Sequence, residues 1–312
     1  MRPGRRSMLL MLAFVALWAA IEALAAQVLT RMSPYQVVWT RYAVHILFML
    51  LIWGWREPAK LWRTRRPVFQ LARSLLMLGM PASWVIAKQL GVPVGTLMSI
   101  FWLSPLFIMG FAWMALAERA NLSVWLACAA GCAGALVVFR PAPVSLELCI
   151  YPLAMALTFS LYVVMTRSLR SETTRANLFY TAIGVLVALS LVMPSLWVTP
   201  TARDLWALTG VGVLGFAALL ALDRMAAAAP VSVSAPIACL HLLFAAGISW
   251  VWHQDRPGIG VTLAMLLMVG AGIFMWVREP DLMAKNDRGD DLPDPGVNVP
   301  VAQSAAHSAR PV

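Results

Sequence analysis

The feature that most constrains this chain is a pair of long apolar segments, residues 93–116 and 122–139, separated only by the polar link 117–121. A helix crosses the hydrocarbon core of a bilayer with roughly 20 apolar residues, and each segment is long enough to do so. In the whole chain 61% of residues are hydrophobic and 12% are charged. A soluble domain has roughly 45–50% and about 25%, so the pattern predicts a polytopic membrane protein.

A diverged second copy of this helical pair lies at residues 229–279. Pro230 corresponds to Pro93, and Asp255 follows Pro230 at the same spacing at which Glu118 follows Pro93. The chain therefore contains a duplicated membrane unit. Many transporters consist of two such repeats and bind their substrate between them, near the middle of the membrane.

Ten apolar runs are expected to span the membrane: 8–28, 35–55, 71–90, 93–116, 122–139, 147–165, 178–198, 205–222, 230–252 and 258–277. The first run resembles a signal peptide, but its removal would break the duplication. The expected fold is an all-α membrane protein with ten transmembrane helices in two inverted five-helix repeats, residues 1–141 and 142–280. Residues 281–312, rich in Asp, Pro and Ser, are expected to form a disordered cytoplasmic tail.

The net charge of +10 comes from cations in the links between the apolar runs. This placement indicates membrane orientation rather than a surface for nucleic acid. The face that holds the N-terminus collects the basic cluster at 56–66. The other face has only Arg31, Lys88, Arg140, Arg203 and Arg256. We therefore expect a multi-pass protein of the plasma membrane, the inner membrane of a bacterium, with both termini inside.

Short motifs recur in order along the chain: Glu22-Ala23, Arg41 after Ser33-Pro34, Arg73-Ser74-Leu75-Leu76, Pro105 before Glu118, Gly134 before Arg140-Pro141, Thr166-Arg167, Ala235-Pro236 and Asp255-Arg256-Pro257. Together they resemble the EamA-type branch of the drug/metabolite transporter superfamily, over residues 8–279. The resemblance implies ten helices in two inverted repeats, a small-molecule substrate, and a central cavity lined by the helix at 230–252. Cys239 departs from a frequent tyrosine, and Asp255 from a usual glutamate.

Ionisable groups inside apolar helices are costly and mark functional sites. Glu22 and Arg41 lie at similar depth on consecutive helices. They either form a structural ion pair, or Glu22 contacts a cationic group of the substrate or a coupling proton. His241 lies in the helix that the resemblance places at the cavity. The candidate substrate-binding residues are Glu22, Arg41, His241, Trp18, Trp84, Trp102 and Tyr162, although aromatic residues in such helices often serve packing alone.

Three side chains are candidates for proton coupling: Glu22, His45 and His241. A carboxyl group and an imidazole are the groups that exchange protons near neutral pH in such surroundings. His45 follows Arg41 by one helical turn, and the alternative for it is a hydrogen bond to a neighbouring helix.

Four residues are candidates for a hinge or gate. Pro105 and Pro236 fall within predicted helices, where each removes a backbone hydrogen bond and permits a bend. Glu118 and Asp255 end helices at corresponding points of the two repeats. The alternative for these acids is a boundary charge in the headgroup region.

The expected function is secondary transport of a small amino-acid-like or amphipathic metabolite by alternating access, with efflux favoured and proton coupling or facilitated exchange left open. Nucleotide-binding and zinc-protease motifs are absent, so no cofactor and no enzyme activity are expected. The alternatives are a membrane enzyme acting on a lipid-linked substrate and a non-transporting membrane protein. A homodimer is left open. The cysteines, at 128, 132, 149 and 239, are expected to be packing residues.

Overall fold

The computed structural model describes residues 1–55, 57–254 and 257–290, and in these ranges it contains helices but no strand. In chain order the elements are α1 (Pro3–Val28), α2 (Pro34–Met49), the π-helix η1 (Leu50–Gly54), α3 (Ala59–Trp62), α4 (Pro67–Gln89), α5 (Val94–Phe101), α6 (Ser104–Leu116), α7 (Leu122–Phe139), η2 (Leu146–Cys149), α8 (Ile150–Ser168), α9 (Thr174–Ser190), α10 (Met193–Leu196), α11 (Ala202–Ala228), α12 (Val231–Ser234), η3 (Ala235–Leu240), α13 (His241–His253) and α14 (Ile259–Asp290). The prediction of an all-α membrane protein is confirmed.

Nine helical segments of the described residues are long and apolar enough to cross a bilayer. They coincide in order with nine of the ten predicted spans. The remaining prediction, 178–198, falls on α9 and α10, and α9 is apolar but has only 17 residues. The count of ten spans therefore stays a prediction.

Local sequence sets where the helices begin. Proline occupies the first turn of α1, α2 and α4, where its missing N–H costs no helical hydrogen bond. The Ser33 and Thr173 side chains cap α2 and α9 by accepting hydrogen bonds from the amides of Gln36 and Ala176. Thr201 and Asp204 cap α11 reciprocally, which satisfies two amide donors that the helix leaves unpaired.

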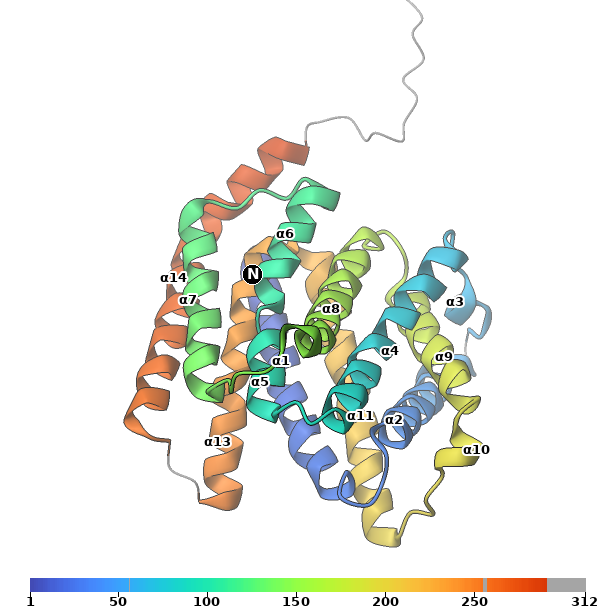
Figure 1. Cartoon of the computed structure of the whole chain (residues 1–312). Helices are drawn as coiled ribbons and strands as arrows, with labels where there is room; N and C mark the ends of the chain where they lie inside the picture. Colours follow the sequence, from blue (N-terminus) through green and yellow to red (C-terminus); the bar gives the residue numbers. More distant parts are fainter. Residues whose placement is uncertain (56, 255–256, 291–312) are drawn as a thin grey trace, which may run out of the picture.

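The helices form one bundle in which segments distant in sequence pack together (Figure 1). α1 packs along α11, and α4 packs along α8. α7 and α14 lie side by side at one edge of the bundle, and α9 with α10 lies at the opposite edge (Figure 1). The long α1 and α11 bring the N-terminal segment into the centre of the bundle, where the candidate site is found.

Two predicted spans are broken in the middle. α5 ends at Phe101 and α6 begins at Ser104, while η3 separates α12 from α13. Pro105 lies in the first turn of α6, and Pro236 in the first turn of η3. Each proline thus begins a new segment rather than bending a continuous helix. At the C-terminus α14 continues to Asp290, through the first residues of the predicted tail, and 291–312 lie outside the described residues.

Candidate functional site

The bundle has two ends, and polar contacts identify them. We call the end at which α1 begins the N-terminal end. There the Ser7 hydroxyl donates to the carbonyl of Met225, near the end of α11 (3.1 Å). We call the other end the distal end. There Arg31, just after α1, forms an ion pair of 2.6 Å with Asp204, and the Gln36 side-chain amide donates to the carbonyl of Val198 (2.6 Å).

A partly open cavity of about 420 Å³ lies toward the distal end, between α1, α2, α4 and α5. Leu29, Pro34 and Val94, at the distal ends of their helices, are part of its wall. Four of the seven predicted substrate-binding residues line this cavity: Trp18, Glu22, Arg41 and Trp84. The remaining wall is largely apolar and includes four methionines, Met77, Met80, Met98 and Met155. Methionine side chains adapt to ligands of different shape.

Glu22 is the carboxylate of this cavity. Its side chain is 38% exposed, so it faces the open space. The indole N–H of Trp18 donates to its Oε1 (2.9 Å), and Oε2 lies 3.0 Å from Nε2 of His241. This last contact is an ion pair only when the imidazole is protonated. The Glu22 carboxylate is thus exposed to the cavity on one side and contacts the buried imidazole of His241 on the other.

Arg41 does not pair directly with Glu22 among the ion pairs of the described residues. Its guanidinium lies 5.4 Å from the ring centre of Trp18 and 4.6 Å from that of Tyr42, and it donates to the Tyr42 hydroxyl (2.9 Å). The aliphatic part of Arg41 packs on Gly215 of α11. The indole of Trp18 therefore connects the two charges, by a hydrogen bond on one side and a cation–π contact on the other.

His241 is 1% exposed and stacks on Trp102, with ring centroids 4.6 Å apart and an interplanar angle of 26°. Neither ring nitrogen of His241 makes a hydrogen bond to a described residue, because the short contact to Glu22 is not aligned for one. His241 and Trp102 therefore form a layer behind Glu22 and are not part of the cavity wall.

Two other predicted residues lie away from the cavity. His45 is fully buried and packs edge-on against Phe216 of α11, at 5.0 Å between ring centroids. Tyr162 is also buried, and its hydroxyl lies 3.3 Å from Oγ1 of Thr181. The structure therefore brings together Glu22, Trp18, Arg41, Trp84 and His241, and leaves His45 and Tyr162 in separate surroundings.

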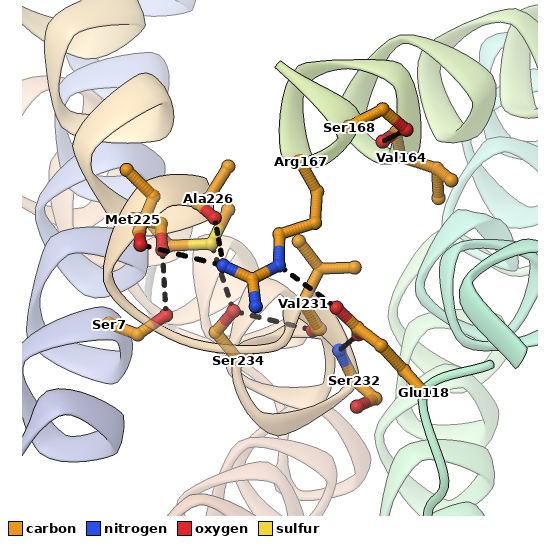
Figure 2. A network of polar contacts seen from close by, with 11 residues as sticks. Ser7, Glu118, Val164, Arg167, Ser168, Met225, Ala226, Val231, Ser232 and Ser234 are labelled. Atoms are coloured by element: carbon orange, nitrogen blue, oxygen red, sulfur yellow. Dashed lines mark hydrogen bonds and ion pairs between the residues drawn. The ribbon is translucent and has the colours of Figure 1, made fainter. Parts of the chain in front are cut away.

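Glu118, just after α6, belongs to a buried network at the N-terminal end (Figure 2). Its Oε1 accepts a hydrogen bond from Nε of Arg167 (3.1 Å), and its Oε2 accepts one from the amide of Ser232 (3.1 Å). Arg167 also donates to the carbonyl of Ala226 (2.8 Å). Burial raises the pKa of Glu118, against the opposing effects of Ser232 and Arg167. The network ties the ends of α6, α8 and α11 to the start of α12.

At the distal end α1 and α13 pack against each other. They leave a gap between them, a cavity of about 370 Å³ lined by small side chains such as Ala23, Ala245 and Ser249. Glu22 and Ala26 line this gap as well as the distal cavity, the one of about 420 Å³. Asp255, the predicted counterpart of Glu118, lies outside the described residues.

A buried arginine was missed as a site residue, although it stands in one of the motifs. Arg73 is 1% exposed and donates to Thr166 Oγ1 (2.9 Å), Gln70 Oε1 (2.9 Å), Asn177 O (2.6 Å) and Thr181 Oγ1 (2.9 Å). Its guanidinium also lies 5.2 Å from the Tyr162 ring centre. An arginine inside an apolar helix is a functional signal, but Arg73 lies at the start of the predicted span 71–90, where the sequence does not distinguish it from a charge at the membrane boundary.

The cysteines Cys128, Cys132 and Cys239 are buried among apolar side chains. A Cβ added to Gly131 of α7 would lie 2.8 Å from the Cys239 sulfur, so α7 and η3 pack closely at this point. In the part of the chain that the structure describes, no group of three or more His, Cys, Asp and Glu residues could hold a metal ion.

Comparison with known proteins agrees with this architecture. Residues 5–140 match the model of the EamA-like transporter family. A relative from Rickettsia bellii, named S-adenosylmethionine uptake transporter, is 23% identical over 261 residues, which cover 82% of this chain and 88% of that protein. A relative of the same name from Rickettsia prowazekii is 22% identical over 259 residues, or 82% and 87%.

One solved crystal structure superposes on 87% of this chain and 96% of its own, with a TM-score of 0.75 at 18% sequence identity, which shows the fold alone. The relatives are named as transporters, so these matches identify a transporter rather than an enzyme. As the motifs predicted, the chain is similar to the EamA-like transporter family, whose model matches its first half.

Proposed function

We propose that this protein carries a small amphipathic metabolite across the inner membrane by alternating access of two inverted five-helix repeats. The proposed pseudo-twofold axis relates α1 to α8, α2 to α9, α4 to α11, α6 to α13 and α7 to α14. It therefore relates the α1–α11 contact to the α8–α4 contact, and the α6–α8 contact to the α13–α1 contact. Both members of each couple occur, which supports the pseudo-twofold arrangement.

The helix ends support the same exchange. Leu29 and Leu169 stand at the C-caps of α1 and α8. Leu103 and Leu240 stand at the N-caps of α6 and α13. Left-handed residues, Ala117 with φ 53° and Gln254 with φ 60°, end those two helices. Glu22 precedes Leu29 by the same number of residues as Tyr162 precedes Leu169, so Glu22 and Tyr162 are counterparts.

The single observation that carries the proposal is the difference between the two ends. Toward the N-terminal end, Glu118 and Arg167 tie α6 to α8. Toward the distal end, α13 and α1 leave a gap between their facing side chains, and a cavity reaches Glu22. With the N-terminus inside the cell, this is a state open to the outside. Glu118 then acts as a gate residue, and the breaks at Pro105 and Pro236 are the hinges.

The cavity favours a substrate with a cationic group and an apolar or aromatic part. Glu22 supplies a negative charge, and Trp18 and Trp84 supply aromatic faces, while the Arg41 guanidinium in the wall is held by Trp18 and Tyr42. A volume of about 420 Å³ is within the range of roughly 300–1,000 Å³ that is usual for small-ligand sites. S-adenosylmethionine, named in the relatives, has such a cation and an aromatic ring, and we take it as the first compound to test. Uptake follows the relatives' names, whereas the sequence favoured efflux.

Protons couple to transport through Glu22 and His241 in this proposal, since their nearest atoms are 3.0 Å apart and Glu22 is exposed to the cavity. Substrate bound to Glu22 would replace the imidazole as its partner, which links occupancy to protonation.

The test is flux of labelled S-adenosylmethionine into and out of proteoliposomes of known orientation. We expect saturable flux that Glu22→Gln reduces and that depends on the pH gradient. If flux is equal with an intact and with a collapsed pH gradient, proton coupling is excluded, while the transport proposal itself still stands. Absence of flux for this compound and for a panel of amphipathic amines and amino acids would overturn the substrate class.

A further inference from the structure

The buried cluster around Arg73 has a charge that its contacts do not neutralise directly. All four hydrogen-bond acceptors of its guanidinium are neutral oxygens, on Thr166, Gln70, Asn177 and Thr181. No carboxylate of a described residue forms an ion pair with Arg73. The nearest link to an acid runs through Asn177, whose Nδ2 donates to Oδ1 of Asp223 (2.8 Å). A buried cation without a directly contacting anion is costly, so the cluster calls for a functional explanation.

The repeat gives this cluster a counterpart. Ser33 and Thr173 cap α2 and α9 in the same way, and Leu29 and Leu169 end α1 and α8. Counted from these caps, the residues around the Arg73 guanidinium replace others one for one. Tyr162 replaces Glu22, Thr166 replaces Ala26, Asn177 replaces Val37, and Thr181 replaces Arg41.

All four replaced residues, Glu22, Ala26, Val37 and Arg41, line the open distal cavity. The residues around Arg73 therefore occupy the positions that line a cavity in the other half of the molecule. In this structure they are buried, and the Glu118–Arg167 hydrogen bond ties α6 to α8 at the same end of the bundle (Figure 2).

We infer that the Arg73 cluster is a second substrate subsite, closed in this state, which binds a carboxylate when the N-terminal end opens. This inference rests on the proposed alternating access, and it names a second group of the substrate besides the cation. In the distal cavity Glu22 takes the cation, while Arg41 in the same wall contacts Trp18 and Tyr42. The Arg73 subsite offers a guanidinium and the hydroxyls of Thr166 and Thr181, a donor set that suits a carboxylate. The substrate class is then a zwitterion with an amino-acid group.

The first experiment tests whether the cluster opens, and it needs no substrate. In a chain whose four cysteines are replaced by alanine, Thr181→Cys is treated with a membrane-impermeant maleimide from the N-terminal side. Labelling should be slow, and it should become about tenfold or more faster when Glu118→Gln weakens the closed state. Val185→Cys, fully buried one turn further along α9, is the matched control and should stay unlabelled. Thr181→Cys that is equally unreactive in both backgrounds would mean a purely structural polar cluster and would overturn the inference.

The second experiment tests the ligand. Transport of S-adenosylmethionine is compared with that of its decarboxylated form, which keeps the cation and lacks the carboxylate. Arg73→Gln should raise the half-saturating concentration of the intact compound about tenfold when it is presented from the N-terminal side. From the distal side the change should be small, and the decarboxylated form should be unaffected on both sides. Arg73→Lys should give a partial effect.

An equal loss for both compounds, or an equal loss from both sides, would show that Arg73 supports the fold and does not bind substrate. If Arg73→Gln does not fold, Thr166→Val removes one hydroxyl of the subsite and serves the same comparison. If the parent chain carries neither compound, the proposed substrate fails, and the labelling of Thr181→Cys still decides whether the subsite opens.

Discussion

The α6–α8 contact and the α1–α13 contact are counterparts in the proposed repeats, yet an ion pair of Glu118 with Arg167 ties the first and a cavity of about 370 Å³ lies in the second. Ile108 and Ala112 of α6 are fully buried. Their counterparts on α13, counted from Leu103 and Leu240, are Ala245 and Ser249, which line the gap. Under the proposed repeat, two copies of one unit therefore pack in two ways within one chain. The comparison then identifies the gap as one of two states of the same helix contact.

Charge distinguishes the two contacts further. Arg167 closes the α6–α8 contact, and its counterpart on α1 is Gln27, which lines the gap. A charge-assisted network therefore holds the N-terminal end, while a neutral amide faces the distal gap. The N-terminal lock is the stronger by this comparison, which agrees with the closed state of that end.

The largest expected effect is that of Arg167→Ala. It leaves Glu118 buried beside Ser232 without its cation, which costs about 3–5 kcal/mol. We expect the closed N-terminal end to open, measured as faster reaction of Thr181→Cys from that side, and a lower melting temperature in detergent. Arg170→Ala, exposed three residues later, should change neither. If both variants behave alike, the network is not the lock.

Glu22→Gln should have the next largest effect. Loss of a charged partner of the substrate is expected to weaken binding from the distal side by about 10- to 100-fold, measured by substrate protection or flux. Glu147→Gln, on the exposed η2 turn, is the control and should leave flux unchanged. Unaltered affinity in Glu22→Gln would place the cation elsewhere.

Ala245→Ile gives the open contact the side chain that the closed contact has at Ile108. Each added buried CH₂ group contributes about 0.8 kcal/mol, so the gap should close more often. We expect Ala23→Cys, in the chain without native cysteines, to react a few fold more slowly from the distal side. Val277→Ile, exposed on α14, serves as control. Faster reaction would contradict the counterpart relation.

The smallest effect is expected for Trp18→Phe, which keeps the aromatic ring but removes the hydrogen bond to Glu22. A net loss of about 1 kcal/mol corresponds to a severalfold weaker binding, seen in the same flux assay. Trp39→Phe removes an exposed indole hydrogen bond, to Ser190, and should have no such effect.

The sequence alone was enough to determine the class of fold, whereas at two prolines it predicted bends where the structure has separate helical segments. A chain in lipid must satisfy its backbone hydrogen bonds internally, so apolar runs of membrane length predict helices. The prolines at 105 and 236 marked the two regions where a span is irregular. Glu22 was identified as a candidate because a carboxyl group in an apolar helix costs free energy wherever it lies along that helix.

Only the tertiary structure decided which of these groups meet. The sequence predicted that Glu22 lies beside Arg41, but the indole of Trp18 lies between these two side chains. The carboxylate of Glu22 is approached instead by His241, which is distant in the sequence. The partners of Arg73 come from α4, α8 and α9. Helical periodicity fixes the face on which a residue lies, but it contains no information about which distant face packs against it. That choice depends on how all the helices of the bundle pack together.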